Sequence, residues 1–238
     1  MTLINIILSY FNEEKKDIMR HIDNWNKFSD NLLNKISFTI IDDCSEINIK
    51  ELLKDSDLSR LDISIFRIKD NIKWNTSGVR NLGALHSDSK YLLILDMDTV
   101  VDSDICSKLI HLSENNIKNS IYFDFNRIVI GNENHPKNNV NHPAVCLIRR
   151  QDYWLVNGCD EELSGNYGYT SNLFKCKLEQ FNVKKQTIKD ISILYYSEAQ
   201  KDNLDRNRSN NKKIFERKRK DNLLPKKLIR FQWEKIYL

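Results

Sequence analysis

Lys-Tyr-Leu-Leu-Ile-Leu-Asp-Met-Asp-Thr-Val-Val, residues 90 to 101, is the stretch of sequence that decides the fold. Its continuous apolar run from Leu92 to Leu95 is typical of a strand buried on both faces of a parallel sheet. The run ends at Asp96 and Asp98, and open α/β sheets bind ligands at the carboxyl ends of their strands. Two carboxylates one residue apart suit a hard divalent cation that would hold phosphates, although an isolated Asp-x-Asp is also typical of a turn or helix cap.

The residues before this strand repeat a pattern of strand, loop and helix. Strands are predicted at Leu3–Leu8, Ile36–Ile41 and Ile63–Ile68, and the second ends in another carboxylate pair, Asp42 and Asp43. Strands and helices alternate four times in the first 110 residues, which predicts a mostly parallel α/β sheet flanked by helices. The helices are expected to end near residues 28, 53, 86 and 112.

The second half of the chain is less regular. Strands are predicted at 120–130, 144–148 and 188–196, with an Asn-rich loop over 131–141 and helices over 149–156 and 170–181. A charged helix is expected over 202–219, followed by an amphipathic helix with Leu224, Leu228 and Phe231 on one face. The 238 residues, 40% hydrophobic, predict one domain over 1–200 and a basic helical extension over 201–238.

Composition narrows the class of protein. No window approaches the roughly 18 apolar residues of a membrane span, and the N-terminus lacks the pattern of a signal peptide, so we expect a soluble cytoplasmic protein. The five cysteines are widely spaced, without a Cys-x-x-Cys pair, and are expected to be free thiols.

The positive charge is concentrated in the extension. Residues 201–238 carry 13 Lys and Arg against 5 Asp and Glu, a net charge of +8, which leaves −4 for residues 1–200. The favoured interpretation is a solvated helix that closes the domain. Peripheral contact with an anionic membrane is the alternative, and nucleic acid is not expected because no recognition motif is visible.

Five stretches resemble, in order and spacing, the motifs of the family 2 glycosyltransferases of the GT-A fold, over about residues 3–180. They cover the first strand with its Tyr-Asn-Glu loop, the Asp-Asp strand end, an Arg-Asn-x-Gly helix, the Asp-x-Asp and an Asn-Gly-Cys-Asp-Glu segment. The stretches are residues 6–14, 38–45, 78–83, 92–98 and 157–163.

The resemblance implies inverting transfer of a sugar from a nucleotide-diphosphate donor, most often a UDP-sugar, to an acceptor hydroxyl of a glycan or lipid-linked acceptor. It divides the domain into a nucleotide-sugar-binding half, 1–112, and an acceptor-binding half, 113–200. Asp98, with Asp96, would bind Mn²⁺ or Mg²⁺ across the diphosphate. The implied donor-binding residues are Tyr10, stacked on the base, Asn12, Glu13, Asp42 or Asp43 at the base, Arg80 at the diphosphate or base, and Asp96 at the ribose.

The sequence departs from the family where the general base is expected. Thr170-Ser171 stand in place of the usual Glu-Asp, and neither hydroxyl is a competent base at neutral pH. Asp160 or Glu161 is the candidate replacement, although this pair usually shapes the acceptor pocket in the family. The proton could instead leave through water or phosphate, or the domain could be a degenerate transferase that binds a nucleotide without catalysis.

A metal-binding histidine usual near the last strand is also missing from residues 194–198. His135 and His142, in the Asn-rich loop, are possible substitutes. We expect both to be solvated loop residues instead.

Overall fold

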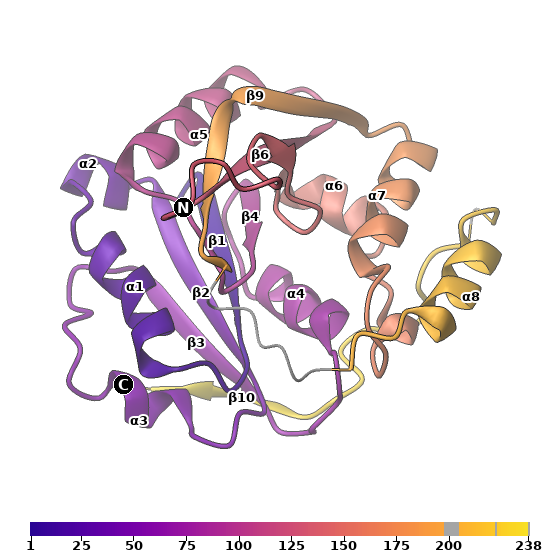
Figure 1. Ribbon diagram of the computed structural model, residues 1–238, viewed down its shortest axis with the longest axis horizontal. Coiled ribbons are helices and arrows are strands. Elements are labelled where there is room, and N and C mark those ends of the chain that lie inside the picture. The colour runs from indigo at the N-terminus through magenta and orange to yellow at the C-terminus, as the bar shows by residue number, and fades with distance from the viewer. Residues whose placement is uncertain (198–204, 222, 238) are drawn as a thin grey trace.

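The computed structural model describes residues 1–197, 205–221 and 223–237, which build a mixed sheet with helices on both faces (Figure 1). The described residues form a ten-stranded sheet in the order β10-β3-β2-β1-β4-β8-β6-β9-β5, with β7 paired to β6. No helix in the described part of the chain is both long enough and apolar enough to cross a membrane.

Four parallel strands form the centre of the sheet, as the alternation of strands and helices predicts. They are β1 (Ile4–Tyr10), β2 (Ile36–Asp43), β3 (Ile63–Ile68) and β4 (Tyr91–Leu95). β4 is buried along its whole length because it lies between β1 and β8 with helices on both faces. The connecting helices are α1 (Lys15–Trp25), α2 (Asp30–Leu33), α3 (Ile49–Leu53) and α4 (Thr76–Leu85).

The second half extends the sheet with antiparallel pairs. β8 (Cys146–Arg149) pairs with β4 and β6 (Ile121–Val129), and β9 (Lys184–Tyr195) runs parallel to β6. The far end of β9 pairs with the two-residue β5 (Thr99–Val100), so the chain after the last long strand returns beside Asp98. The remaining elements are α5 (Ser103–Asn115), β7 (Val140–Asn141), α6 (Arg150–Leu155), a 3-10 turn (Glu161–Leu163) and α7 (Thr170–Gln180).

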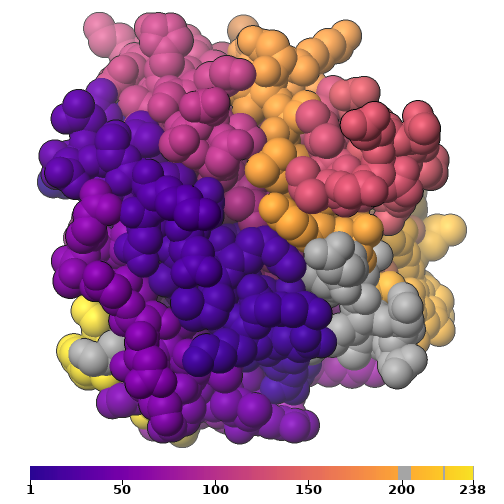
Figure 2. Space-filling view, turned by 60° about the vertical axis from the view of Figure 1, so that its left-hand side comes forward, coloured from indigo at the N-terminus to yellow at the C-terminus, as the bar shows by residue number. Residues whose placement is uncertain are grey.

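Side chains on alternate positions of β1 face two different cores. Ile6 packs with α1, α3 and α5 on one face, and Ile7 packs with α4, α6 and α7 on the other. This alternation follows from the two-residue period of a strand. On the face shown in Figure 2, the orange β9 lies above and to the right of the indigo N-terminal segments.

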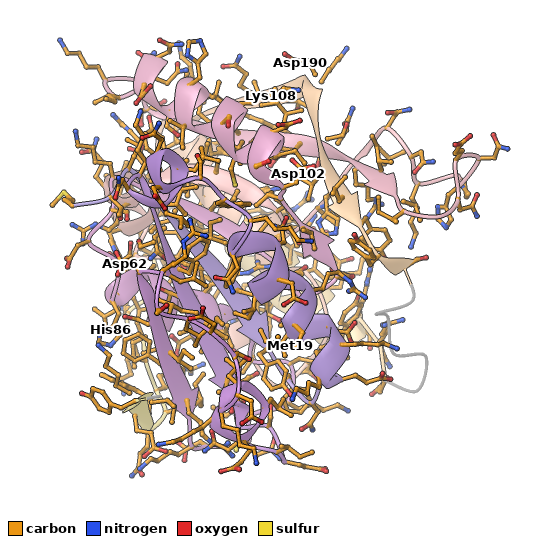
Figure 3. The ribbon with its side chains drawn as sticks, turned by 90° about the vertical axis from the view of Figure 1, so that its left-hand side faces the viewer. Met19, Asp62, His86, Asp102, Lys108 and Asp190 are labelled. Carbon is orange, nitrogen blue, oxygen red and sulfur yellow. The ribbon has the colours of Figure 1, made fainter. Side chains whose placement is uncertain are left out.

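The extension differs from the prediction of two helices. Residues 202–204 lie outside the described part, α8 (Ser209–Lys218) is helical, and the segment expected as an amphipathic helix ends instead in β10 (Trp233–Ile236). β10 pairs antiparallel with β3 and so covers a sheet edge that would otherwise expose unpaired amides. His86 lies at this edge (Figure 3), stacked on Phe66 and in edge contact with Trp233.

Phe231 explains why the extension is part of the domain. Its side chain is 7% exposed and packs with Val79 and Leu82 of α4 in a third apolar cluster. A Cβ on Gly78 would lie 2.4 Å from the Phe231 ring, so glycine at this position of α4 admits the tail. α8 is largely exposed but is tied to the domain by the buried Asn211, and membrane contact stays a prediction.

Candidate functional site

Asp96 and Asp98 lie at the carboxyl end of β4, where the sequence placed them. A tight turn holds them, because the Thr99 hydroxyl and amide both donate to the Asp96 carbonyl, at 2.7 and 3.0 Å. The Tyr196 amide donates to the Asp98 carbonyl at 2.8 Å, which ties the turn to the end of β9. Asp102, at the start of α5 (Figure 3), caps that helix by accepting from the Ile105 amide at 2.8 Å.

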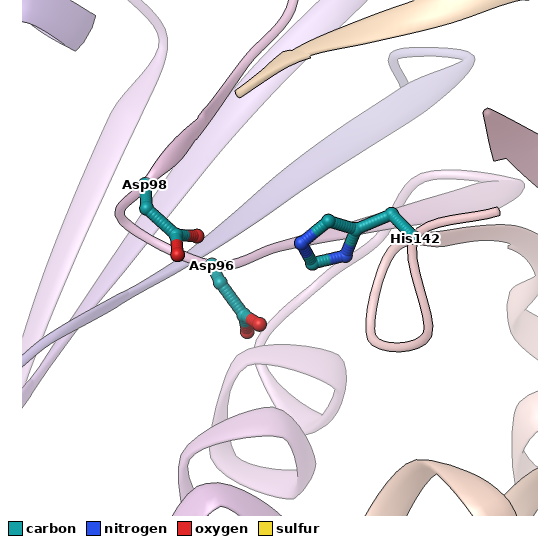
Figure 4. A group of neighbouring side chains, drawn as sticks. All are labelled: Asp96, Asp98 and His142. Atoms are coloured by element: carbon teal, nitrogen blue, oxygen red, sulfur yellow. The ribbon is translucent and has the colours of Figure 1, made fainter. Parts of the chain in front are cut away.

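His142 joins the two carboxylates, and this corrects the expectation of a solvated loop histidine. One ligand atom from each of Asp96, Asp98 and His142 lies within 4.8 Å of the others. The imidazole is 4% exposed and points toward the carboxylates (Figure 4). The His142 amide donates to the Phe125 carbonyl at 2.9 Å, which fixes the residue against β6. Two carboxylates and an imidazole form a ligand set suited to a divalent cation such as Mn²⁺.

The protonation of this cluster supports the same interpretation. Burial, together with the Asp96 carboxylate, raises the pKa of Asp98 to about 7. Burial lowers the pKa of His142 to about 4, so its imidazole is neutral at pH 7. One Asp98 oxygen is buried without a hydrogen-bond partner among the described residues. A neutral imidazole and a buried carboxylate oxygen with an unused lone pair are groups that a divalent cation would satisfy.

Arg80 connects this cluster to the start of α7. Its guanidinium, 2% exposed, pairs with the Asp96 carboxylate at 3.2 Å and donates to the Ser171 hydroxyl at 2.9 Å. Thr170 lies beside it, with its hydroxyl 3.5 Å from that of Ser77. The position where the family usually carries its base is therefore occupied by a hydroxyl that accepts from Arg80.

The two carboxylates at the end of β2 have different surroundings. Asp42 is fully buried and accepts from the Ser45 amide at 2.8 Å and from Arg67 at 3.1 Å. The Asp43 carboxylate accepts from the Asn75 side chain at 3.2 Å, and burial raises its pKa to about 7. Of the two carboxylates, Asp42 is therefore the more fully engaged by the protein itself.

The first loop is tied to the rest of the domain. Tyr10 is 1% exposed and its hydroxyl donates to the Glu13 carbonyl at 3.0 Å, so its ring is part of the core and has no face open for stacking. The side-chain oxygen of Asn12 accepts from the Glu46 backbone amide at 2.7 Å, and the backbone amide of Asn12 donates to the Ser45 hydroxyl. Glu13 is half-buried and contributes to the raised pKa of Asp98, which places its carboxylate near the cluster.

Asp160 and Glu161 are engaged by the C-terminal extension. Glu161 is 1% exposed and accepts from Asn81 and from the Ile229 amide, both at 2.8 Å. Asp160 pairs with Lys218 of α8 and accepts from the Glu162 amide at 3.0 Å. These contacts support the loop and engage both carboxylates with the tail.

His21 lies beneath the turn that carries the two aspartates. It is fully buried on α1, and its Nε2 nitrogen donates to the Met97 carbonyl at 3.0 Å. Burial lowers the pKa of His21 to about 4, below the 6.5 of an unfolded chain.

The pKa of His21 predicts how stability depends on pH. Between pH 6.5 and 4 the unfolded chain binds a proton that the folded chain does not, so the stability conferred by neutral His21 is full above 6.5 and is lost as pH falls. Between pH 7 and pH 4.5 the free energy of unfolding of the native protein should fall, and the fall should exceed that of the His21→Gln variant by on the order of 2 kcal/mol. Urea unfolding at both pH values measures this, and equal losses would contradict the prediction.

Comparison of the sequence with family models gives one finding. The model described as Glycosyl transferase family 2 matches residues 5–177. The match includes the carboxyl ends of β1, β2 and β4, and the C-terminal extension lies outside it. No curated protein sequence matches the chain.

Structural comparison gives the same fold. The structure of S. aureus TarS 1-349 in complex with UDP-GlcNAc superposes with a TM-score of 0.64 at 12% identity, over 82% of this chain and 58% of that one. The mannosyltransferase PcManGT from Pyrobaculum calidifontis, in complex with GDP-Man and Mn2+, gives 0.62 at 12%, over 80% and 56%. GalNAc-T7 with UDP, GalNAc and Mn2+ gives 0.66 at 15%, over 82% and 44%. The chain therefore spans about half the length of these proteins, and at these identities the likeness concerns the fold.

Proposed function

The chain belongs to the family 2 glycosyltransferases, and on that premise we propose that it transfers a sugar from a nucleotide-diphosphate donor to an acceptor hydroxyl. The observation that carries the proposal is the cluster of Asp96, Asp98 and His142 at the carboxyl end of the central strand β4. That edge of an open α/β sheet is where ligands bind. UDP is our preferred nucleotide, by analogy with the family.

The donor would lie across the ends of β2 and β4. Asp43 would accept from the N–H of the nucleotide base, because Asn75 is the only side chain in the described part of the chain that donates to its carboxylate. The buried guanidinium of Arg80 would hold Asp96 in place and face the diphosphate, where its planar donors suit phosphate oxygens. Asp96 would keep its ion pair with Arg80 and also bind the ribose.

Asp96, Asp98 and His142 would hold the metal ion. A divalent cation bound there neutralises negative charge on the departing nucleoside diphosphate. The protein's own contribution is to supply one neutral and two acidic ligands whose positions are fixed by the turn at Thr99 and by β6. Burial raises the pKa of Asp98 to about 7, and the positive charge of a bound cation would lower it and favour the ionised carboxylate.

The acceptor proton takes a different route from that usual in inverting members. Ser171 accepts from Arg80, and Glu161 is enclosed by Asn81 and the tail, so neither serves as a base in our proposal. We propose that the proton passes to water or to a donor phosphate oxygen while the site contributes orientation and charge stabilisation. Attack on the face opposite the leaving group would give inversion.

Calorimetric titration of UDP, GDP, CDP and dTDP, with and without Mn²⁺, tests the proposal. We expect one nucleotide to bind, more tightly with Mn²⁺, and the matching sugar nucleotide to be hydrolysed or transferred. Binding without turnover, even when candidate acceptors are supplied, would favour a nucleotide-binding module without catalysis, for which Thr170-Ser171 is the motivating feature. Failure of all four nucleotides to bind would refute the donor site built on Asp96 and Asp98.

A further inference from the structure

A small pocket lies between the loop before α4, the loop before α7 and the segment that leads into α8. Trp74, Asn166, Tyr167, Asp205, Asn207 and Asn210 contribute to its wall. We propose that this pocket binds one edge of a neutral sugar ring of the acceptor. The inference rests on the proposed function, since it assigns a saccharide acceptor to the same transfer site.

The pocket combines aromatic and amide side chains in the way that saccharide recognition requires. The rings of Trp74 and Tyr167 contact each other with centroids 4.7 Å apart and planes inclined by 55°, and both are partly exposed. An aromatic ring can pack against the C–H face of a sugar, while side-chain amides both donate to and accept from hydroxyls. Asn166, Asn207 and Asn210 supply three such amides.

The charge of the pocket favours an uncharged ligand. Its lysine, Lys73, pairs with Asp205 at 3.6 Å, so the two charges offset each other. The guanidinium of Arg208 lies 5.2 Å from the centre of the Tyr167 ring and stacks on it. With a volume of about 80 Å³, the pocket is far smaller than the roughly 300 Å³ of a site for a whole small ligand. It therefore fits the edge of one ring of a larger acceptor.

The walls of the pocket are fixed before any ligand binds. The buried Asn211 of α8 donates to the carbonyls of Leu163, Asn166 and Gly168, at 3.0, 2.8 and 2.8 Å. The Trp74 indole donates to the Asp205 carbonyl at 3.0 Å, and Trp74 has a φ of 53°, a strained value for a bulky residue. Such preorganisation reduces the conformational entropy lost on binding.

The pocket is joined to the donor site on two sides. Asn75, next to Trp74 in the chain, donates to Asp43 at 3.2 Å and accepts from Ser164 at 3.0 Å. Ser171, four residues after Tyr167, accepts from Arg80. A sugar held in the pocket would thus extend from the transfer site along the loop before α7. Asp205, Asn207 and Asn210 lie outside residues 5–177, whereas Trp74 and Tyr167 lie within them, so the pocket forms between the matched family segment and the extension.

Saturation-transfer NMR on the full chain tests the inference, with the methyl glycosides of glucose, galactose, mannose and N-acetylglucosamine as probes at millimolar concentration. We expect transfer to at least one glycoside, and a fall in its affinity of roughly tenfold in Trp74→Ala. Asn210→Ala, which removes an exposed amide that donates to Asn166 at 3.0 Å, should lower the affinity without affecting folding. Tyr237→Ala removes an aromatic side chain that is 73% exposed and outside the pocket, and should change nothing.

Nucleotide titration of the same variants separates this inference from the proposed function. Unchanged nucleotide affinity together with weakened glycoside binding in Trp74→Ala and Asn210→Ala would support the pocket. Transfer to none of the four glycosides, or equal transfer in the native protein and both variants, would overturn it even if the nucleotide binds. Loss of nucleotide binding by the native protein would instead refute the proposed function.

Discussion

Replacing Asp98 with alanine is expected to abolish Mn²⁺-dependent binding of the nucleotide and to lower donor turnover by about 10³-fold or more. The physical reason is the loss of one of the three ligands at the end of β4, since metal stabilisation of a leaving phosphate contributes several kcal/mol and each 1.36 kcal/mol is a factor of ten in rate. Calorimetry with Mn²⁺ and the preferred nucleotide measures the first effect, and release of nucleoside diphosphate measures the second.

One control variant tests whether the effect is local, and a second variant tests the cost of burying the Asp98 charge. Asp88→Ala removes an exposed carboxylate that precedes the same strand at its other end, and should leave binding and turnover unchanged. Asp98→Asn keeps the size of the side chain but removes a charge whose burial raises the pKa to about 7, so above pH 7 its free energy of unfolding should equal or exceed that of the native protein. Metal-dependent binding that survives in Asp98→Ala would contradict the assignment.

Replacing Phe231 with alanine is expected to lower the free energy of unfolding by about 3–5 kcal/mol. The ring is 7% exposed, packs with Ile41, Phe66 and Val79, and occupies the space above Gly78. Its removal would leave a cavity beneath the tail. It would also weaken the adjacent hydrogen bond that Glu161 accepts from the Ile229 amide at 2.8 Å. Against a total stability of about 5–15 kcal/mol, the change would be large enough to measure by urea unfolding.

Leu223→Ala is the matched control for the tail. Leu223 belongs to the same extension but is 66% exposed, so its truncation should alter the free energy of unfolding by no more than about 0.5 kcal/mol. If Phe231→Ala were as stable as Leu223→Ala, the extension would not be an integral part of the fold.

The sequence alone determined the central sheet and the ends of its strands. β1, β2, β3 and β4 follow from apolar runs, and α4 and α5 from the capping and periodicity of their segments, because these signals depend on neighbours only a few residues away. The placement of Asp43, Asp96 and Asp98 followed as well, since the carboxyl ends of parallel strands meet at one edge of a sheet. Arg80, on α4, was assigned only through the resemblance to the family.

Other residues could not be assigned because their roles depend on contacts between distant parts of the chain. His142 lies 44 residues beyond Asp98, and only the pairing of β8 with β4 and β6 brings it to the cluster. Tyr10 and Glu161 carry the right side chains for ligand contact and catalysis, yet burial and the tail engage them. No local pattern reports such burial.

The C-terminal extension shows the same limit most clearly. Its spacing of apolar residues is compatible with a helix, but a strand forms because β3 presents an open edge and Gly78 leaves room for Phe231. The local sequence determined the four central strands and the carboxylates that end β2 and β4. The tertiary structure decided the third ligand of the cluster, the partners of Asp160 and Glu161 and the fold of the tail, because each of these results from packing between segments that the sequence places far apart.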